Sequence, residues 1–447
     1  MPTVAYLGNQ FPVAVEPYVG WEIEELKRRG VRVIAGSARR PETSTRGSGH
    51  SHSGPEILCL QPIHILTLFR ALRLAIRHWK LLGDPLTRIL LHGKESPKRR
   101  LKALLHTALG VYYAAMLRGR GVDHIHVHHG YFGSWIAMVA ARLLGIGFSL
   151  TLHGSDLLVN GAYLDTKLKN CQFCFTISEY NRRYILQQFP DTDAGKMIVS
   201  RLGVNISERS GLPRRVARGE RRTITLLTVG RLHAVKDQAF LIGACARLRD
   251  RGVDFKCLIA GEGTERRKLE SLIREHRLQD RVTLLGHIDQ PAMDSLYLHA
   301  DLFVLTSRSE GIPLVLMEAM ARGRVVIAPA ITGIPELVVA GKTGLLYTPG
   351  ALEDLVAKIA LLQRLIASEE DSDAVSRLDW VRHAARVQIL HNFNRTKSLI
   401  HFGDLFLQRI APPYRSARSV QSHSSQPQNS QPQNWSPPHE DSVLQQV

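Results

Sequence analysis

The chain has 447 residues, 44% hydrophobic and 22% charged, a globular composition with length for two or three domains. Its formal net charge of +18 calls for an anionic partner or surface, without choosing among nucleic acid, phospholipid and a phosphorylated substrate. The five cysteines are an odd number and few for this length, which argues against a disulfide scaffold and indicates a reducing compartment.

The sequence shows no targeting segment. The N-terminus has neither a basic stretch nor a long apolar core, so no signal peptide is predicted. No run of ~18 apolar residues predicts a membrane-spanning helix. We therefore expect a cytoplasmic protein, and peripheral attachment to the inner face of a membrane stays open.

The chain opens with a strand–helix–strand unit. Val4–Leu7 is the first predicted strand, Trp21–Lys27 lies in the helix, and Val31–Ile34 is the next strand. A unit of this kind is typical of a parallel, doubly wound sheet. The Ser-, Gly- and His-rich residues 41–55 predict a mobile loop.

Residues 62–120 are helical by pattern and strongly basic, with twelve Lys and Arg against two acidic residues. Apolar side chains recur between the cations at helical spacing. The pattern fits an ordinary amphipathic pair of helices with a solvated face, and it also fits a surface that docks on an anionic membrane. No nucleic-acid motif accompanies the cations, so we expect no nucleic-acid partner. The apolar residues are Leu66, Phe69, Leu72, Ile76 and Trp79.

Strands and helices then alternate again up to residue 207, which completes a predicted N-terminal domain of residues 1–207. Cys171 and Cys174 form a lone C-x-x-C beside an apolar run, where cysteine packs as a small hydrophobe. The Arg-, Gly- and Pro-rich residues 208–222 predict the interdomain linker. The predicted elements are strands at 123–128, 148–152 and 197–200, a helix at 132–144, and a strand and helix within 171–189.

The second half repeats the alternation, so a second doubly wound domain is predicted over residues 223–379. A final helical segment, 380–411, is expected to pack back toward the first domain, and the Ser-, Gln-, Asn- and Pro-rich residues 412–447 predict a disordered tail. Two such domains place a cleft at the carboxyl ends of their strands, where ligands bind. The predicted strands are 223–229, 255–260, 282–285, 302–305 and 325–328.

Two glutamates flank the start of a predicted helix in the second domain. Glu310 lies in the loop after an apolar strand, and Glu318 lies about two turns into the helix that Pro313 begins. The free amides near Gly311 suit an anion or a sugar hydroxyl between two carboxylate acceptors. Alternatively, Glu310 merely precedes a helix and Glu318 is solvated, although the apolar neighbours of Glu318 make an unpaired charge costly.

Three further side chains face the predicted cleft. Arg231 and Lys236 follow the first strand of the second domain, and a guanidinium beside an ammonium suits a diphosphate, although two loop cations are also common by chance. His153 follows a strand of the first domain on the opposite side. It could hydrogen-bond a substrate hydroxyl or the backbone. Alternatively, His153 is structural, or Ser155 or Asp156 caps a helix there.

Two glycines follow the strand 255–260. Gly261 and Gly263 match part of a dinucleotide fingerprint whose third glycine is replaced by Arg266, so only a close backbone approach to a ligand is predicted. The D-x-D at Asp191 lies in a polar loop with no strand before it, and we predict no metal site.

In combination these residues resemble glycosyltransferase family 4, the group 1 glycosyltransferases, over roughly residues 1–405. Residues 176–184 are similar to bacterial exopolysaccharide members of the colanic acid type. The resemblance implies a GT-B fold, two Rossmann-like α/β domains facing across a cleft, with a nucleotide-sugar donor in the second and the acceptor in the first. It also implies retention of anomeric configuration and no catalytic metal. The residues that carry it are Arg231 with Lys236, Glu310 with Glu318, Gly333–Leu337, Gly344–Leu346 and His153–Asp156.

The resemblance also implies roles for these positions. Arg231 and Lys236 would hold the donor diphosphate and stabilise the leaving group, because a breaking sugar–phosphate bond places negative charge there. Glu310 would contact the sugar hydroxyls, and Glu318 would accept from the ribose hydroxyls. His153 would contact the sugar near the reacting centre. The backbone at Gly311, Ile312, Pro313 and Leu314 would support the sugar or phosphate. Asp237 follows the lysine, where the family usually has glycine.

The sequence thus predicts a retaining glycosyltransferase of polysaccharide or glycolipid assembly that moves a sugar to a saccharide or lipid-linked acceptor. It needs no cofactor beyond the nucleotide-diphosphate sugar co-substrate. The alternatives are another enzyme on the same scaffold, such as a nucleotide-sugar epimerase or a phosphorylase, and a non-catalytic sugar-nucleotide binding protein.

Overall fold

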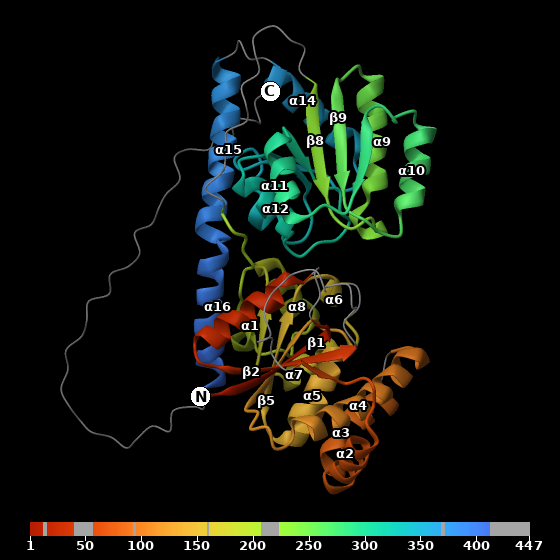
Figure 1. Ribbon diagram of the computed structural model, residues 1–447, viewed down its shortest axis with the longest axis vertical. Helices are drawn as coiled ribbons and strands as arrows, with labels where there is room; N and C mark the ends of the chain where they lie inside the picture. The colour runs from red at the N-terminus through yellow and green to blue at the C-terminus, as the bar shows by residue number, and fades with distance from the viewer. Residues whose placement is uncertain are drawn as a thin grey trace, which may run out of the picture.

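The computed structural model describes residues 1–11, 16–39, 57–92, 95–158, 161–206, 223–367 and 372–411. The predicted loop 41–55, linker 208–222 and tail 412–447 lie outside these residues. Two parallel sheets, each flanked by helices, stand one above the other along the long axis of the molecule in the described part of the chain (Figure 1). The predicted α/β architecture of two doubly wound domains is confirmed.

The first sheet has seven parallel strands within the described ranges, in the order β3-β2-β1-β4-β5-β6-β7. The order reverses between β1 and β4, which is the point where doubly wound sheets place their ligands. The central strands are buried on both faces; most of their side chains are apolar, but β4 also buries His124, His126 and His128. The strands are β1 (Thr3–Gln10), β2 (Arg32–Arg39), β3 (Ile57–Cys59), β4 (His124–His128), β5 (Gly147–Leu152), β6 (Phe173–Thr176) and β7 (Met197–Val199).

Helices pack closely on this sheet. α5 ends where Gly145 adopts a left-handed φ of 68°, as is common after a helix C-terminus. α4 and α5 approach each other at Gly110, where a Cβ would lie only 2.7 Å from Val139 Cβ. The helices are α1 (Pro17–Arg28), α4 (Pro97–Leu117), α5 (Phe132–Leu144), α6 (Ser155–Leu158), α7 (Leu164–Asn170) and α8 (Glu179–Gln188).

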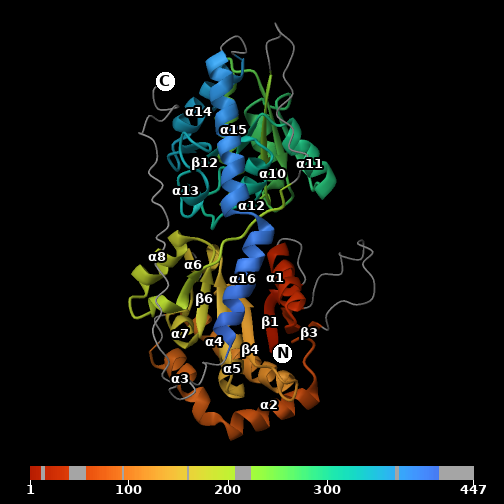
Figure 2. The same cartoon turned by 90° about the vertical axis from the view of Figure 1, so that its left-hand side faces the viewer.

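The basic segment after residue 62 contains α2 (Ile65–Arg77) and α3 (Trp79–Leu90) in addition to α4. The prediction of an amphipathic pair is wrong in number, since three helices form in the described part of the segment. α2 and α3 lie at the end of the first domain remote from the second domain (Figures 1 and 2). Within the described residues, no helix is both long enough and apolar enough to cross a bilayer.

The two cysteines of the C-x-x-C are buried beside and within β6. Cys171 is 1% exposed and Cys174 is 0% exposed. Burial raises the pKa of the Cys171 thiol to about 12, so the thiol stays protonated. The prediction that they pack as small hydrophobes is confirmed.

The second sheet has six parallel strands in the described residues, in the order β10-β9-β8-β11-β12-β13. Helix α12 begins at Leu314, with Pro313 at the N-cap position, so the prediction that Pro313 lies in the first turn is wrong by one residue. The elements are β8 (Ile224–Val229), α9 (Gln238–Asp250), β9 (Phe255–Ala260), α10 (Arg266–Glu275), β10 (Val282–Gly286), α11 (Gln290–His299), β11 (Leu302–Val304), α12 (Leu314–Ala321), β12 (Val325–Pro329), α13 (Ile334–Leu337), β13 (Leu345–Tyr347) and α14 (Leu352–Ala367).

The chain then returns to the first domain. The predicted single helical stretch is two helices, α15 (Ser372–Asn392) and α16 (Arg395–Ile410), because the backbone breaks at Asn394 to form an isolated β-bridge with Val204. Val204 donates to Phe393 O at 2.9 Å, and Arg395 donates back to Val204 O at 3.1 Å. Figure 2 shows α16 lying along the first domain, where Phe402 and Phe406 pack on the aromatic rings of β6.

Candidate active site

Lys236 and Glu310 meet in the second domain although 74 residues separate them. Lys236 ends a short 3-10 helix, Ala234–Lys236, and Glu310 lies in the loop between β11 and α12. Lys236 Nζ lies 2.5 Å from Glu310 Oε1, and the side chains are only 20% and 10% exposed. The two charges therefore neutralise each other within the protein.

Hydroxyl groups fix the backbone on both sides of this pair. Thr306 donates to Lys236 O at 3.1 Å, and Thr332 donates to Glu310 O at 2.6 Å. Asp237, next to the lysine, has a left-handed φ of 48°, a conformation that favours glycine. Its carboxylate accepts from Arg308 Nε at 2.6 Å, so the charge of Arg308 compensates the charge of Asp237.

Arg231 lies on the loop after β8 with its side chain exposed, and within the described residues no hydrogen bond or ion pair holds its guanidinium. Gly261 and Gly263 support this loop, because a Cβ on either would clash with Gly230 O or Leu232 O. Their close backbone approach is thus to the protein's own chain, and this explains both glycines without a ligand.

The two domains touch at Gly311. A Cβ there would clash with His153 O and Ile177 Cδ1 of the first domain. On the other side, a Cβ on Gly154 would lie 3.0 Å from Gly311 N. His153, Glu310 and Lys236 therefore border one junction between the domains. Ile312 and Pro313 are buried, so their side chains are not exposed to a ligand.

Glu318 is half-buried on α12. Its Oε2 accepts from the Tyr297 hydroxyl at 2.9 Å. Burial raises the pKa of the Glu318 carboxyl, an effect that the Tyr297 hydrogen bond and Arg322 only partly offset. The alternative of a solvated helix residue is wrong, and half-burial leaves room for a ligand hydroxyl.

Glu336 makes a further contact between the domains beside this junction, where a Cβ on Gly333 would lie 2.7 Å from Gly311 O and 3.2 Å from Ser178 Cβ. The Glu336 carboxylate of α13 accepts from Glu179 N at 3.0 Å and from Tyr180 N at 2.6 Å, the first two amides of α8. Ser178 Oγ accepts from the third, Asn181 N. Glu336 thus completes the N-terminal capping of a helix that belongs to the other domain.

The His153 loop is held by a buried carboxylate. Asp156 is 0% exposed and accepts from the backbone amides of Gly130, His153 and Gly154 at 2.9, 3.1 and 2.7 Å. Burial alone would raise the pKa of the Asp156 carboxyl, but His129 and the Gly154 amide hold that pKa well below its usual range. Asp156 is a positioning residue of the loop, a role that its place in the sequence did not reveal.

The two histidines beside Asp156 carry different charges. Burial alone would lower the pKa of His129, but the Asp156 and Glu16 carboxylates outweigh it and raise that pKa to about 10. Burial lowers the pKa of His153, and the charge of His129 lowers it further. His153 is therefore neutral beside a cationic His129.

Glu22, His126 and His128 lie close enough to hold a metal ion, with ligand atoms within 4.8 Å of one another. Each ring nitrogen already has a hydrogen-bonding partner, however. His126 contacts Ser149 Oγ at 2.7 Å and Thr151 Oγ1 at 3.0 Å, and His128 contacts Glu22 and His153. A metal would have to displace these bonds.

Comparison with known proteins matches the second domain. Residues 214–374 match the family described as Glycosyl transferases group 1. The second domain belongs to the group 1 glycosyl transferases. The resemblance predicted from Arg231, Lys236, Glu310 and Glu318 is confirmed.

Two relatives of the chain carry names from exopolysaccharide biosynthesis. The putative colanic acid biosynthesis glycosyltransferase WcaL of Escherichia coli is 36% identical over 207 residues, which are 45% of this chain and 48% of WcaL. The amylovoran biosynthesis glycosyltransferase AmsK of Erwinia amylovora is 29% identical over 72% of this chain and 76% of AmsK. The chain matches about half the length of WcaL.

Solved structures show the fold of the whole chain. Sucrose-phosphate synthase from Thermosynechococcus elongatus superposes with a TM-score of 0.67 at 20% identity, over 91% of this chain and 99% of that one. Anabaena HepE in complex with UDP and glucose gives a TM-score of 0.63 at 17% identity, over 91% of this chain and 100% of that one. The predicted GT-B fold is confirmed.

Proposed function

We propose that the protein is a retaining glycosyltransferase that moves a sugar from a nucleotide-sugar donor to a saccharide or lipid-linked acceptor in exopolysaccharide or glycolipid biosynthesis. One observation carries the proposal: Lys236 and Glu310 lie 2.5 Å apart at the junction where Gly311 meets the His153 loop. Fixed cations there would stabilise a departing diphosphate. The names of WcaL and AmsK and the UDP and glucose bound to HepE support the donor and pathway classes.

Each residue has one part in this proposal. Lys236 and Arg231 hold the diphosphate, Glu310 grips the sugar, and Glu318 accepts from the ribose. No divalent cation takes part, because the two side-chain cations and the amides before α12 supply the positive potential.

The test is mass spectrometry of products formed from a panel of nucleotide-sugars and lipid-linked or free saccharide acceptors, with and without EDTA. We expect a glycosylated product whose new linkage keeps the anomeric configuration of the donor, by proton NMR. Conversion of the nucleotide-sugar without an acceptor would instead indicate an epimerase. Binding without any conversion would indicate a non-catalytic protein.

We further propose that α2 and α3 dock the enzyme on an anionic membrane. Leu66, Phe69, Ile76 and Trp79 are 61–70% exposed on these two helices. A groove of about 560 Å³ with an almost wholly apolar lining runs between them. The same helices carry four basic residues, Arg70, Arg73, Arg77 and Lys80. Exposed apolar side chains together with basic ones are typical of helices that bind the surface of an anionic membrane.

Flotation with lipid vesicles tests the docking surface. The protein should float with phosphatidylglycerol-containing vesicles more than with phosphatidylcholine vesicles. The double variant Phe69→Ser/Trp79→Ser should lose this binding, whereas Trp380→Ser, which removes a 45% exposed tryptophan from α15, should keep it. Equal recovery from both vesicle types would contradict the proposal.

A further inference from the structure

A chain of three polar side chains, the first two of them buried, ends at His153. Its first member is Glu22 of α1, whose residue is 4% exposed. His128 of β4 lies next, with Nε2 at 3.0 Å from Glu22 Oε2 and Nδ1 at 2.9 Å from His153 Nε2. The His128 and His153 rings are stacked, with centroids 5.2 Å apart. These residues come from three separate elements, and no described part of the group 1 domain contributes to them.

The protonation pattern of this chain follows from its first link. An ionised carboxylate can only accept hydrogen bonds, so both Tyr6 Oη, at 2.7 Å, and His128 Nε2 must donate to Glu22. Donation to Glu22 uses the proton on Nε2 of His128, so in the singly protonated form of this ring Nδ1 has the lone pair and accepts from Nε2–H of His153. A neutral His153 with its proton on Nε2 has its lone pair on Nδ1.

The free nitrogen of His153 is therefore an acceptor. Among the described residues, no group hydrogen-bonds to His153 Nδ1. The carbonyl of the same residue accepts from Asn181 Nδ2 at 3.1 Å and lies against Gly311 of the other domain. The loop that carries this ring thus borders the domain junction, where a sugar hydroxyl would be a suitable donor to Nδ1.

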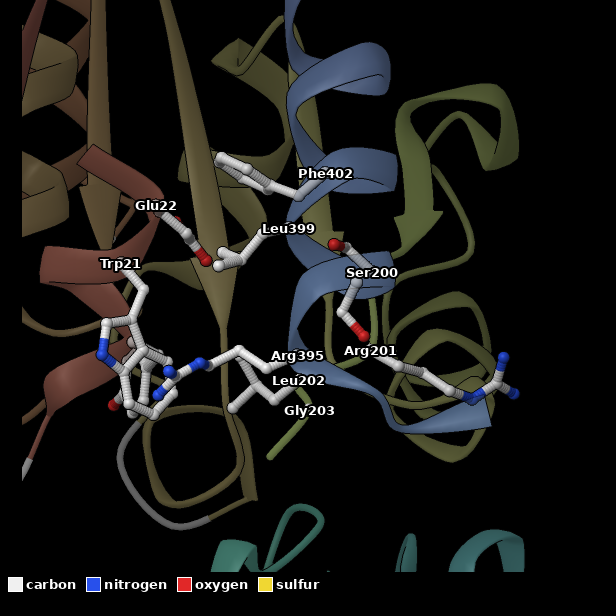
Figure 3. A pocket seen from close by; sticks show the side chains of 11 residues that line it. Trp21, Glu22, Ser200, Arg201, Leu202, Gly203, Arg395, Leu399 and Phe402 are labelled. Carbon is white, nitrogen blue, oxygen red and sulfur yellow. The ribbon is translucent and has the colours of Figure 1, made fainter. Parts of the chain in front are cut away.

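The far end of the chain is closed. Glu22 points toward Leu399 of α16 and lines a cavity of about 20 Å³ between α1, the segment 200–203 and α16 (Figure 3). Such a cavity has room for about one water molecule. Glu22 is therefore held by protein groups rather than by bulk solvent, and this favours a fixed hydrogen-bonding direction.

We propose that Glu22 and His128 are positioning residues that lock His153 in the Nε2–H tautomer, so that Nδ1 accepts a hydrogen bond from a hydroxyl of the bound sugar. The proposal rests on the proposed glycosyl transfer for the identity of the hydroxyl. The tautomer itself rests only on the contacts of Glu22, His128 and His153. Outer partners of this kind orient histidine rings in many enzyme sites.

The direct test is the tautomer of His153 in the full-length protein, read from side-chain ¹⁵N shifts of ¹⁵N-histidine-labelled samples and assigned with His153→Gln. Wild type should show Nε2–H with an unprotonated Nδ1. His128→Leu removes the acceptor and should release this tautomer. His128→Asn, whose amide oxygen can take the place of Nδ1, should restore it.

Two further variants keep the test decisive. Glu22→Gln preserves shape but lets an amide donate to His128, so it should produce a mixture of tautomers even if His128→Leu fails to fold. His124→Gln changes another buried histidine of β4, which contacts Ser149 Oγ at 2.7 Å, and should leave the His153 shifts unchanged.

Kinetics then connects the tautomer to transfer. With the donor and acceptor found in the product panel, Glu22→Gln should lower kcat roughly 10- to 100-fold and leave the donor KM nearly unchanged. His124→Gln should lower neither. An unchanged kcat in Glu22→Gln would overturn the positioning role.

Other results would also overturn the inference. It fails if wild-type His153 carries its proton on Nδ1, or if Glu22→Gln leaves the tautomer fixed. It also fails if the purified protein contains stoichiometric zinc and Glu22→Gln loses it. That result would indicate a metal site at Glu22, His126 and His128 instead of the hydrogen-bonded chain. If His153 has a single tautomer in a protein that transfers no sugar, the proposed function is refuted, but the positioning of His153 by Glu22 and His128 is not.

Discussion

Glu336→Ala should loosen the junction between the two domains. The Glu336 carboxylate accepts the amides of Glu179 and Tyr180 at the start of α8, at 3.0 and 2.6 Å. Its side chain is 16% exposed, so water replaces these bonds only in part. Removing it leaves two amides at a helix N-terminus without an acceptor.

The expected size follows from this geometry. A hydrogen bond to a charged group contributes about 1.5–3 kcal/mol, and losing the carboxylate also removes a favourable charge at a helix N-terminus. We therefore expect the contact between Glu336 and the start of α8 to lose about 2 kcal/mol of stability. The equilibrium constant for local opening of this contact should rise roughly 30-fold. Glu336→Gln keeps one acceptor oxygen without charge and should cause about half this loss.

Hydrogen–deuterium exchange of peptides that cover residues 177–184 measures the effect. Exchange at Glu179 and Tyr180 should accelerate roughly 30-fold in Glu336→Ala. Glu353→Ala is the matched control, because that side chain is 59% exposed and its ion pair with Arg251 should contribute little. Equal protection in wild type and Glu336→Ala would refute the reasoning.

Two other changes have clear expected outcomes. Gly311→Ala should lower both the thermal midpoint and the transfer rate, because its Cβ would clash with the His153 loop. The control Gly243→Ala in α9, whose Cβ would meet only Leu352 at 3.9 Å, should be neutral or slightly stabilising. Equal thermal midpoints and transfer rates in the two variants would contradict the close contact at Gly311. The pKa of His129 rises from 6.5 unfolded to about 10 folded, so its stabilising charge is fully present below pH 6.5 and lost as the pH rises through about 10. The difference in thermal midpoint between wild type and His129→Asn should therefore be largest at pH 6 and shrink toward pH 10, and a constant difference would contradict it.

Much of the fold could be predicted because its signals are local. The helix 132–144 is correct at both ends, since its apolar face stops at Gly145. The edge strands β3 (Ile57–Cys59) and β13 (Leu345–Tyr347) were missed, although β7 and β11, which are equally short, were predicted. Glycine and proline residues lie close on both sides of β13 and before β3, and such a context is typical of loops. The break at residues 393–394 was missed because its cause, pairing with Val204, is remote in sequence.

The candidate site divides in the same way. The motif glutamates and cations of the second domain were predictable from their spacing. Glu22 was not, because it has the sequence of a solvated helix residue and only packing against β4 and α16 buries it. The alternation of His124, His126 and His128 along one strand was a visible signal, since alternate residues of a strand share a face.

The most direct test of the central claim is the turnover of Lys236→Ala with the donor and acceptor found in the product panel. Lys256→Ala, at an exposed lysine on β9, is the matched control, and Lys236→Met/Glu310→Gln shows whether the unpaired Glu310 charge disturbs folding. If Lys236 neutralises the departing diphosphate, kcat should fall by about 100-fold or more in Lys236→Ala with a near-native circular dichroism spectrum. Turnover equal to that of Lys256→Ala would contradict the account.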